Sequence, residues 1–329
     1  MALKHISCYF RAHLLWILAF FPAVFAQLSP DFYTWSCPYL PMIVKFNVQR
    51  AVENDMRIAA SLLRLHFHDC IVDGCEGSVL LDDTNDMKGE KNAPPNKNSL
   101  RGFDVIDDIK ADVERFCPFT VSCTDILTLA AREAVYLSGG PYWPVGLGRR
   151  DGTKASENSA NEQIPSPIKP LDNIIAKFTS KGLDLKDVVV LSGGHTIGYA
   201  QCFTFKRRLF DFNGSGKPDP TLDNSLLTSL RGTCPNKDDS NTKLAPLDSA
   251  STYTFDSAYY SNLVNNEGLL ESDQALMSDP RTAALVNSYY ADPKLFYKDF
   301  GASMARLGSV GVLTGQSGQI RKKCGTVNY

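Results

Sequence analysis

The sequence of 329 residues is long enough to bury a large core, either in one big domain or in two lobes that share one. Its 34 Lys and Arg nearly balance its 36 Asp and Glu. This balance gives no strongly basic surface, so neither nucleic acid nor an anionic membrane is expected as a partner.

The chain begins with a predicted secretory signal peptide over residues 1–26. Lys4 and Arg11 precede an apolar run at 14–25 that is too short to span a bilayer, and Ala26 offers a small residue for cleavage. A membrane anchor is the alternative. Without Lys4 and Arg11, 32 basic residues remain against 36 acidic ones, so residues 27–329 carry a net charge of −4.

Helical periodicity dominates the first half of the mature chain. Apolar residues recur at three-and-four spacing over 42–67, 99–116 and 125–137, which predicts a helix in each range. Ser122, followed three residues later by Asp125, has the pattern of a capping box at the start of the third range.

The second half continues in the same way. Helices are predicted over 171–182, which ends on Gly182, and over 282–308. The segment 184–194 begins with the N-cap candidate Asp184, although Val188–Val190 would suit a strand as well. No repeat and no separable linker occurs, so 27–329 is expected to be one mainly α domain.

Three long irregular stretches separate these helices, at 82–102, 149–170 and 213–256. Loops of this length in a compact domain usually carry function or are held by disulfides or metals. The third begins with the sequon Asn213-Gly-Ser, a predicted glycosylation site.

Eight cysteines remain once Cys8 has left with the signal peptide. In a secreted chain this even number predicts four disulfides, but eight cysteines allow 105 pairings. A zinc site is the weaker alternative because the chain has no Cys-x-x-Cys pair. The eight are Cys37, Cys70, Cys75, Cys117, Cys123, Cys202, Cys234 and Cys324.

Histidine is scarce, since the mature chain has only His66, His68 and His195. Arg64 and His68 are four apart and share a helix face, whereas His66 points elsewhere and is interpreted as structural. A guanidinium and an imidazole on a buried face are costly unless a ligand or an internal partner meets them. His195 follows two glycines in "LSGGHTIG", which suits an axial metal ligand approached by something flat, with a capped turn as the alternative.

Oxygen-bearing side chains are crowded between 69 and 78, where glycines allow tight turns. Such a density of oxygen ligands suits Ca²⁺, although the spacing is not that of an EF-hand. A solvated acidic loop is the alternative.

The motifs "RLHFHDC", "GEKNAPPNKNSLRGFDVID", "LGRRD", "LSGGHTIG", "FDSAYYSNL" and "GLLESDQAL" occur in this order between 27 and 324. Together they resemble those of the class III secretory plant haem peroxidases. The resemblance implies a mainly α, two-lobed fold with four disulfides and haem b between the distal and proximal lobes.

The resemblance also assigns roles around the haem. His195 would bind the iron and Asp273 would accept the N–H of His195. On the opposite side, His68 would move a proton between the two oxygens of hydrogen peroxide, and Arg64 would stabilise the developing charge. The supporting residues implied there are Phe67, which would keep bulky donors from the iron, and Asn96 and Glu90, which would continue the hydrogen-bond chain from His68.

Two Ca²⁺ sites follow from the same resemblance. The distal ligands would be Asp69, Val72, Gly74, Glu76 and Ser78, and the proximal ligands Thr196, Asp248, Ser251, Thr254 and Asp256. Glu76 stands where the family usually has aspartate, and Ser251 where threonine is common. The longer Glu76 raises the question of whether the distal ion binds less tightly.

The implied disulfides are Cys37–Cys117, Cys70–Cys75, Cys123–Cys324 and Cys202–Cys234. Pro165 matches the proline that contacts phenolic donors, whereas Pro94, Ile168 and Thr204 stand where some members place phenylalanines. The resemblance further implies a monomer, and the short stretch after Cys324 favours secretion to the cell wall over the vacuole. Lignification, wall cross-linking and stress responses are the candidate roles.

Three rival interpretations compete with this one. A zinc or non-haem iron enzyme using His66 and His68 is disfavoured, because histidines two apart on a helix cannot converge on one metal. A wall-associated binding glycoprotein that has lost catalysis would lack a required residue, and none is missing. A donor route through a surface tryptophan could use only Trp35 or Trp143, and Trp143 lies among apolar residues.

Overall fold

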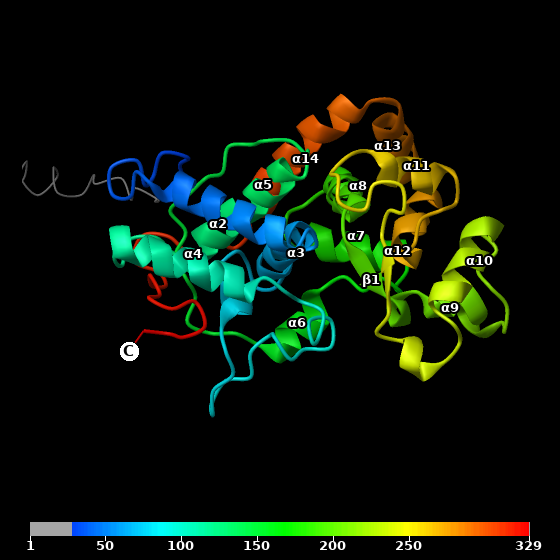
Figure 1. The fold of residues 1–329 in the computed structure, drawn as a ribbon, viewed down its shortest axis with the longest axis horizontal. Coiled ribbons are helices and arrows are strands. Elements are labelled where there is room, and N and C mark those ends of the chain that lie inside the picture. The colour runs from blue at the N-terminus through cyan, green and yellow to red at the C-terminus, as the bar shows by residue number, and fades with distance from the viewer. Residues whose placement is uncertain (1–27, 329) are drawn as a thin grey trace, which may run out of the picture.

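The computed structural model describes residues 28–328 as a mainly helical molecule with one small sheet (Figure 1). The predicted signal peptide at 1–26 lies outside the described residues. The helices are α2 (Leu40–Asn54), α3 (Ile58–Ile71), α4 (Phe103–Phe116), α5 (Cys123–Leu137), α6 (Glu157–Gln163), α7 (Leu171–Thr179), α8 (Leu185–Ser192), α9 (Lys206–Phe210), α10 (Asn224–Thr233), α11 (Ala258–Val264), α12 (Glu271–Gln274), α13 (Pro280–Ala291) and α14 (Pro293–Leu307). None of the described helices is both long and apolar enough to cross a membrane.

The helices form two groups that follow the chain order. Helices α2 to α5 pack together on one side of the molecule, and α7 to α13 gather on the other (Figure 1). Helix α14 contacts both groups, because it packs against α3 as well as α8 and α13. One large apolar core runs through both groups, and it includes Leu62 of α3, Ile126 of α5 and Phe300 of α14.

A second, smaller core lies around α9 and α10. It contains Phe205, Leu209 and Leu230 together with Leu269 and Leu270, which precede α12. The only regular sheet of the described residues borders this unit, where strand β1 (Tyr199–Gln201) pairs antiparallel with β2 (Leu244–Pro246).

Two of the predicted helices are each interrupted. The range 42–67 contains the end of α2 and the start of α3, and the extended backbone of Asp55 separates them. The range 282–308 is divided at Asp292. Its backbone is extended because a proline disfavours helical backbone in the residue before it, and Pro293 then begins α14. The prediction of one continuous helix was therefore wrong in both ranges.

The ambiguous segment 184–194 is a helix followed by a tight turn. Asp184 and Asp187 form a reciprocal capping box at the start of α8. Val188–Val190 are all buried, so this stretch of the helix is enclosed on every side. For this reason the pattern of apolar and polar residues could not distinguish a helix from a strand here. A 3₁₀ turn, η2 (Gly193–Thr196), then carries His195.

The four disulfides pair as the resemblance implied, which confirms Cys37–Cys117, Cys70–Cys75, Cys123–Cys324 and Cys202–Cys234. Cys123–Cys324 joins the first residue of α5 to a segment 201 positions further along the chain. Cys202–Cys234 closes the unit that holds α9 and α10.

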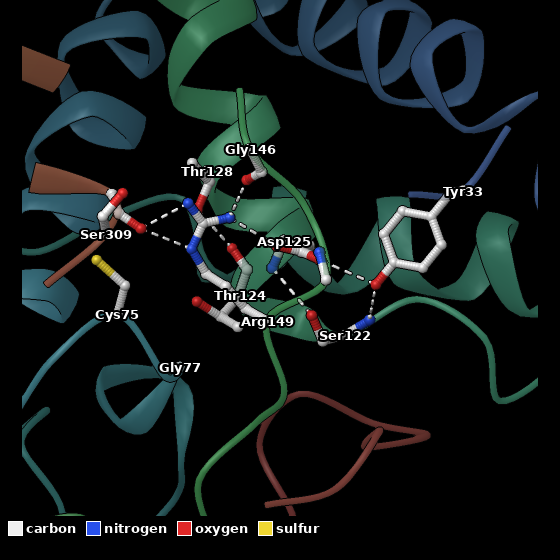
Figure 2. A network of polar contacts seen from close by, with 12 residues as sticks. Tyr33, Cys75, Gly77, Ser122, Thr124, Asp125, Thr128, Gly146, Arg149 and Ser309 are labelled. Carbon is white, nitrogen blue, oxygen red and sulfur yellow. Dashed lines mark hydrogen bonds and ion pairs between the residues drawn. The ribbon is translucent and has the colours of Figure 1, made fainter. Parts of the chain in front are cut away.

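A buried polar network ties the segment before α2 to α5 and to the end of α14 (Figure 2). Tyr33 Oη donates to Asp125 Oδ2 at 2.9 Å, and Arg149 Nη1 donates to Asp125 Oδ1 at 2.7 Å. Arg149 Nε also donates to the carbonyl of Gly308 at 2.8 Å. Because Asp125 and Arg149 are almost fully buried, removing one partner would leave an uncompensated charge, which costs about 3–5 kcal/mol.

Candidate active site

A cavity of about 600 Å³ lies between the two helical groups. Arg64, Phe67 and His68 of α3 line it, together with Leu191 of α8 and His195 of η2. The volume falls within the range of about 300–1,000 Å³ usual for small-molecule and cofactor sites. The cavity therefore brings together residues that the resemblance assigned to the two sides of a haem.

His68 is held as a neutral base on the α3 wall. Its Nδ1 lies 2.7 Å from Asn96 Oδ1, and Asn96 Nδ2 donates to the carbonyl of Glu90 at 2.9 Å. Because the Asn96 oxygen must accept, Nδ1 of His68 carries the proton and Nε2 keeps its lone pair. Burial, and then the positive charge of Arg64, hold the pKa of His68 well below its usual value, although the Asn96 bond opposes this.

Arg64 is fixed beside His68 by the irregular loop that follows. Its Nη2 donates to the carbonyl of Pro95 at 2.8 Å, and its Nη1 donates to the carbonyl of Ser99 at 3.1 Å. Its Nε lies 3.2 Å from His68 Nε2. Burial lowers the pKa of Arg64 to about 10, so the guanidinium keeps its charge at neutral pH.

Glu90 enters this chain through its main chain rather than its carboxyl group. Both carboxyl oxygens are buried without a hydrogen-bond partner among the described residues. Burial raises the pKa of Glu90 to about 9, so the group is protonated and uncharged at neutral pH. The proline-rich turn thus uses the Glu90 carbonyl to orient Asn96, and through Asn96 it orients His68.

His66 lies on another face of α3 and does not line the cavity. It is buried beside Cys70 Sγ, and burial, followed by the charge of Arg149, lowers its pKa to about 3. It is therefore a neutral core residue.

His195 faces the cavity from the turn after α8. Its Nδ1 lies 2.8 Å from Asp273 Oδ1, and that oxygen also accepts from Tyr259 Oη at 3.1 Å. Burial lowers the pKa of His195, but the charge and hydrogen bond of Asp273 outweigh burial, and the net pKa is raised. With Nδ1 engaged, Nε2 is the nitrogen left for a ligand.

The two glycines before His195 have different surroundings. A Cβ on Gly193 would lie 2.5 Å from Tyr260 Oη, so this glycine is required by the core and not by a flat group in the cavity. Gly194 does line the cavity, and a Cβ there would come within 3.3 Å of Leu63 Cδ2. The expectation that the backbone admits a flat group therefore applies to Gly194 alone.

The expected distal calcium residues surround the disulfide loop after α3. Asp69 Oδ1 and Ser78 Oγ are buried without a hydrogen-bond partner among the described residues. Burial raises the pKa of both Asp69 and Glu76 to about 7. Unpartnered oxygens and carboxylates destabilised by burial fit a cation, although the described residues hold no group of three acidic, histidine or cysteine side chains placed as metal ligands.

The expected proximal residues meet directly behind His195. Thr196 Oγ1 donates to Asp256 Oδ1 at 3.1 Å and approaches Asp248 Oδ2 at 3.5 Å, and Ser251 Oγ lies 3.4 Å from the same Asp248 oxygen. Thr254 N donates to the carbonyl of Ser251 at 2.9 Å. All five residues thus belong to one cluster.

The mouth of the cavity is lined by Pro165 and Ile168, together with Pro94 and Thr204. It also contains two aromatic residues, Phe203 and Tyr199, that the sequence analysis missed. Phe203 exposes 54% of its surface beside the cavity. The resemblance indicated Thr204 in this stretch. The 3₁₀ turn η3 (Cys202–Thr204), whose Cys202 is tied by a disulfide, also brings the exposed Phe203 to the cavity.

The remaining predicted positions lie away from the cavity. Asn213 is exposed on a turn with a φ of 53°, so its side chain is accessible. Trp143 is buried and Trp35 is exposed, and neither lines the cavity.

The chain is similar to known proteins over a range that includes the whole candidate site. A family model described as "Peroxidase" matches residues 44–292. The chain is 63% identical over 302 residues to Peroxidase 10 of Arabidopsis thaliana, covering 91% of this chain and 86% of that protein. It is 54% identical over 310 residues to Peroxidase N of Armoracia rusticana, covering 93% of each. The range matched by the family model includes Arg64, His68, His195 and Asp273.

Proposed function

Because the chain belongs to the class III plant peroxidases, we propose that residues 27–329 form a single secreted haem peroxidase domain that reduces hydrogen peroxide and oxidises small phenolic donors. The observation that carries this proposal is the pair of histidines, from the two different helical groups, that line one cavity. Each has its Nδ1 tied by an oxygen acceptor, so each directs Nε2 as its reactive nitrogen.

The cavity residues fit a haem b group. His195 would hold the iron through Nε2, and Asp273 would make that imidazole a stronger donor. Gly194 and Leu191 leave an apolar wall beside it. Haem would supply an iron that accepts peroxide and takes up its oxidising equivalents.

His68 then carries out the proton transfer. Its neutral Nε2 removes a proton from the nearer peroxide oxygen, while the Asn96 bond keeps the imidazole in place. The same nitrogen delivers the proton to the farther oxygen, so water can leave. Arg64, already anchored to Pro95 and Ser99, stabilises the negative charge that develops as the oxygens separate.

Donor binding belongs at the mouth of the cavity. Pro165 and Ile168 provide apolar contact, and the exposed ring of Phe203 offers a stacking partner for a phenol. Phe67 lies beside His68 and Phe178, where it restricts access to the inner cavity. Small phenols would therefore be oxidised from the rim.

The remaining parts of the proposal rest on the sequence. Two Ca²⁺ ions would bind next to Asp69 and Thr196, with Glu76 completing the distal set. The protein would act as a glycosylated monomer in the cell wall, with a glycan at Asn213. Lignification, wall cross-linking and stress responses are the roles we propose.

Reconstitution with haem tests the function. The purified protein should show a Soret band and oxidise guaiacol with hydrogen peroxide, whereas His195→Ala should bind haem poorly unless imidazole is added. A matched control is His66→Gln, which changes a buried histidine outside the cavity. Normal haem binding and turnover by His195→Ala would refute the assignment.

A further inference from the structure

Asp273 lies on a short element that cannot fix its position alone. Helix α12 has four residues, and Leu270 before it is extended. A single turn of helix has little intrinsic stability in water, so surrounding contacts must hold it. Two contacts hold α12 directly, because Arg207 pairs with Glu271 and the Ser272 amide donates to the Pro167 carbonyl at 3.1 Å. The contacts of the preceding Gly268–Leu270 also set the direction of the Asp273 carboxylate toward His195.

Arg208 of α9 grips this segment through its carbonyl groups. The Arg208 side chain is fully buried, and its Nη1 donates to the carbonyls of Gly268, of Leu269 at 2.8 Å and of Leu270 at 3.3 Å. The Leu270 carbonyl in turn accepts the amides of Asp273 and Gln274, both at 3.2 Å. One guanidinium thus holds the chain that starts α12.

The guanidinium is itself fixed by a second buried charge. Arg208 Nε donates to Asp219 Oδ2 at 2.7 Å, and the Thr221 amide and hydroxyl donate to Asp219 Oδ1 at 2.9 and 2.7 Å. The Asp219 amide donates back to the Arg208 carbonyl at 2.8 Å. A buried ion pair adds little net stability, but its planar, directional bonds define a position well.

The side chains of the same segment are held by the same unit. Leu269 and Leu270 are buried in the small core with Phe205 and Leu209, which flank Arg208. The disulfide Cys202–Cys234 closes this unit. The carbonyls and the side chains of 268–270 are therefore held by the same α9–α10 unit. Asp273 follows three residues later and meets His195 Nδ1 through Oδ1 at 2.8 Å.

We propose that Arg208, set by Asp219, is a positioning residue for Asp273, so that the α9–α10 unit controls how strongly His195 donates electrons to the iron. The inference rests on the proposed haem function, because it needs His195 as the iron ligand. It assigns to this small unit an electronic role in addition to packing.

Arg231 offers a control for Arg208, because it supports the same unit without contacting the segment before α12. Arg231 also braces α9, since its Nη2 donates to the Leu209 carbonyl at 2.7 Å and its guanidinium lies 5.2 Å from the centroid of the Phe210 ring. It makes no hydrogen bond to Gly268–Asp273. Arg231→Gln therefore loosens the same unit without releasing the carbonyls that Arg208 holds.

The test compares four variants of the haem-loaded protein. Asp273→Asn is the reference, and Arg231→Gln is the control. The double variant Arg208→Gln with Asp219→Asn removes both buried charges. Arg208→Lys keeps the positive charge but loses the planar guanidinium that bonds the carbonyls and Asp219. The readouts are the Fe(III)/Fe(II) potential and the iron–histidine stretching frequency of the ferrous form in resonance Raman spectra.

Asp273→Asn should raise the potential and lower the stretching frequency, because a neutral acceptor replaces the anion. The double variant and Arg208→Lys should shift both readouts in the same direction by a smaller amount, and Arg231→Gln should leave them unchanged. Arg208→Lys decides the matter if the double variant does not bind haem. Wild-type values for the Arg208 variants, or an equal shift in Arg231→Gln, would overturn the inference. An unshifted Asp273→Asn would instead contradict the proposed function.

Discussion

In the proposed reaction, His68 is the residue on which the step with peroxide most directly depends, since it is a neutral base held beside a fixed cation. His68→Ala should slow the reaction with peroxide by roughly 10²–10⁴-fold while haem stays bound. Arg64→Leu should slow it less, because it removes charge stabilisation but keeps the base. Stopped-flow recording of the Soret change after mixing with peroxide measures both rates, and near-normal reactivity of His68→Ala would rule out its role.

The protonation state of His68 predicts a pH profile. Burial and the charge of Arg64 lower its pKa well below 6.5, so the neutral base persists as the pH falls from about 8 through 6.5. The rate of reaction with peroxide should stay constant over this range and decline only in more acidic solution. Arg64→Leu removes one of the lowering causes, so its acid decline should begin at a higher pH. A wild-type decline centred near 6.5 would contradict the buried, neutral state.

At the same scale, motifs indicated the residues that we propose to react, but not the contacts that support them. The spacing of Arg64 and His68 was enough to place both on one face. The sequence could not show that Glu90 acts through its carbonyl, because a motif does not distinguish main-chain from side-chain contacts. It could not find Phe203 either, since the turn after Cys202 determines which side chain reaches the rim.

Among the elements, α8 carries the local signal that places His195. The exposed Asp184 caps the helix by accepting from the Asp187 amide at 2.9 Å. Asp184→Ala should lower the free energy of unfolding by about 0.5–2 kcal/mol, whereas Asp184→Asn, which can still cap, should lower it much less. Chemical denaturation of the two variants measures this difference, and equal stabilities would show that the cap does not stabilise α8.

The elements also show where periodicity fails. It identified the helical ranges because their buried faces repeat every three or four residues. It missed the breaks at Asp55 and Asp292, because the apolar pattern continues across both. At Asp292 the following Pro293 was a usable signal. At Asp55 the side chain forms a local turn by accepting from the Arg57 amide at 2.9 Å, and an ion pair with Arg101 joins it to a residue 46 positions away. Tertiary contacts of this kind cannot be read from local spacing.

At the scale of the whole molecule, calcium removal should destabilise both sides of the cavity, because Asp69 and Thr196 directly follow the two key histidines. EDTA should lower the melting temperature and the peroxidase activity without immediate loss of haem. Unchanged melting temperature, activity and spectrum after EDTA would refute the calcium sites.

The decrease in thermal stability caused by calcium removal should be larger at about pH 8 than at about pH 5. In the metal-free fold, burial raises the pKa of Asp69 and of Glu76 to about 7, above their unfolded values. The folded state therefore binds more protons than the unfolded state at pH 5, and this stabilisation disappears as the pH rises through 7. Thermal unfolding with EDTA at the two pH values, with a calcium-saturated sample as control, checks the sign.

The disulfide between Cys123 and Cys324 can form only late in synthesis of the chain. Its two cysteines are 201 positions apart, so at about 5–20 residues per second Cys324 leaves the ribosome roughly 10–40 s after Cys123. Throughout that interval the Cys123 thiol has no native partner, while Cys117 and Cys37 are already available as wrong ones. The cell must therefore either protect this thiol or reshuffle its early bonds before the largest loop of the molecule can close.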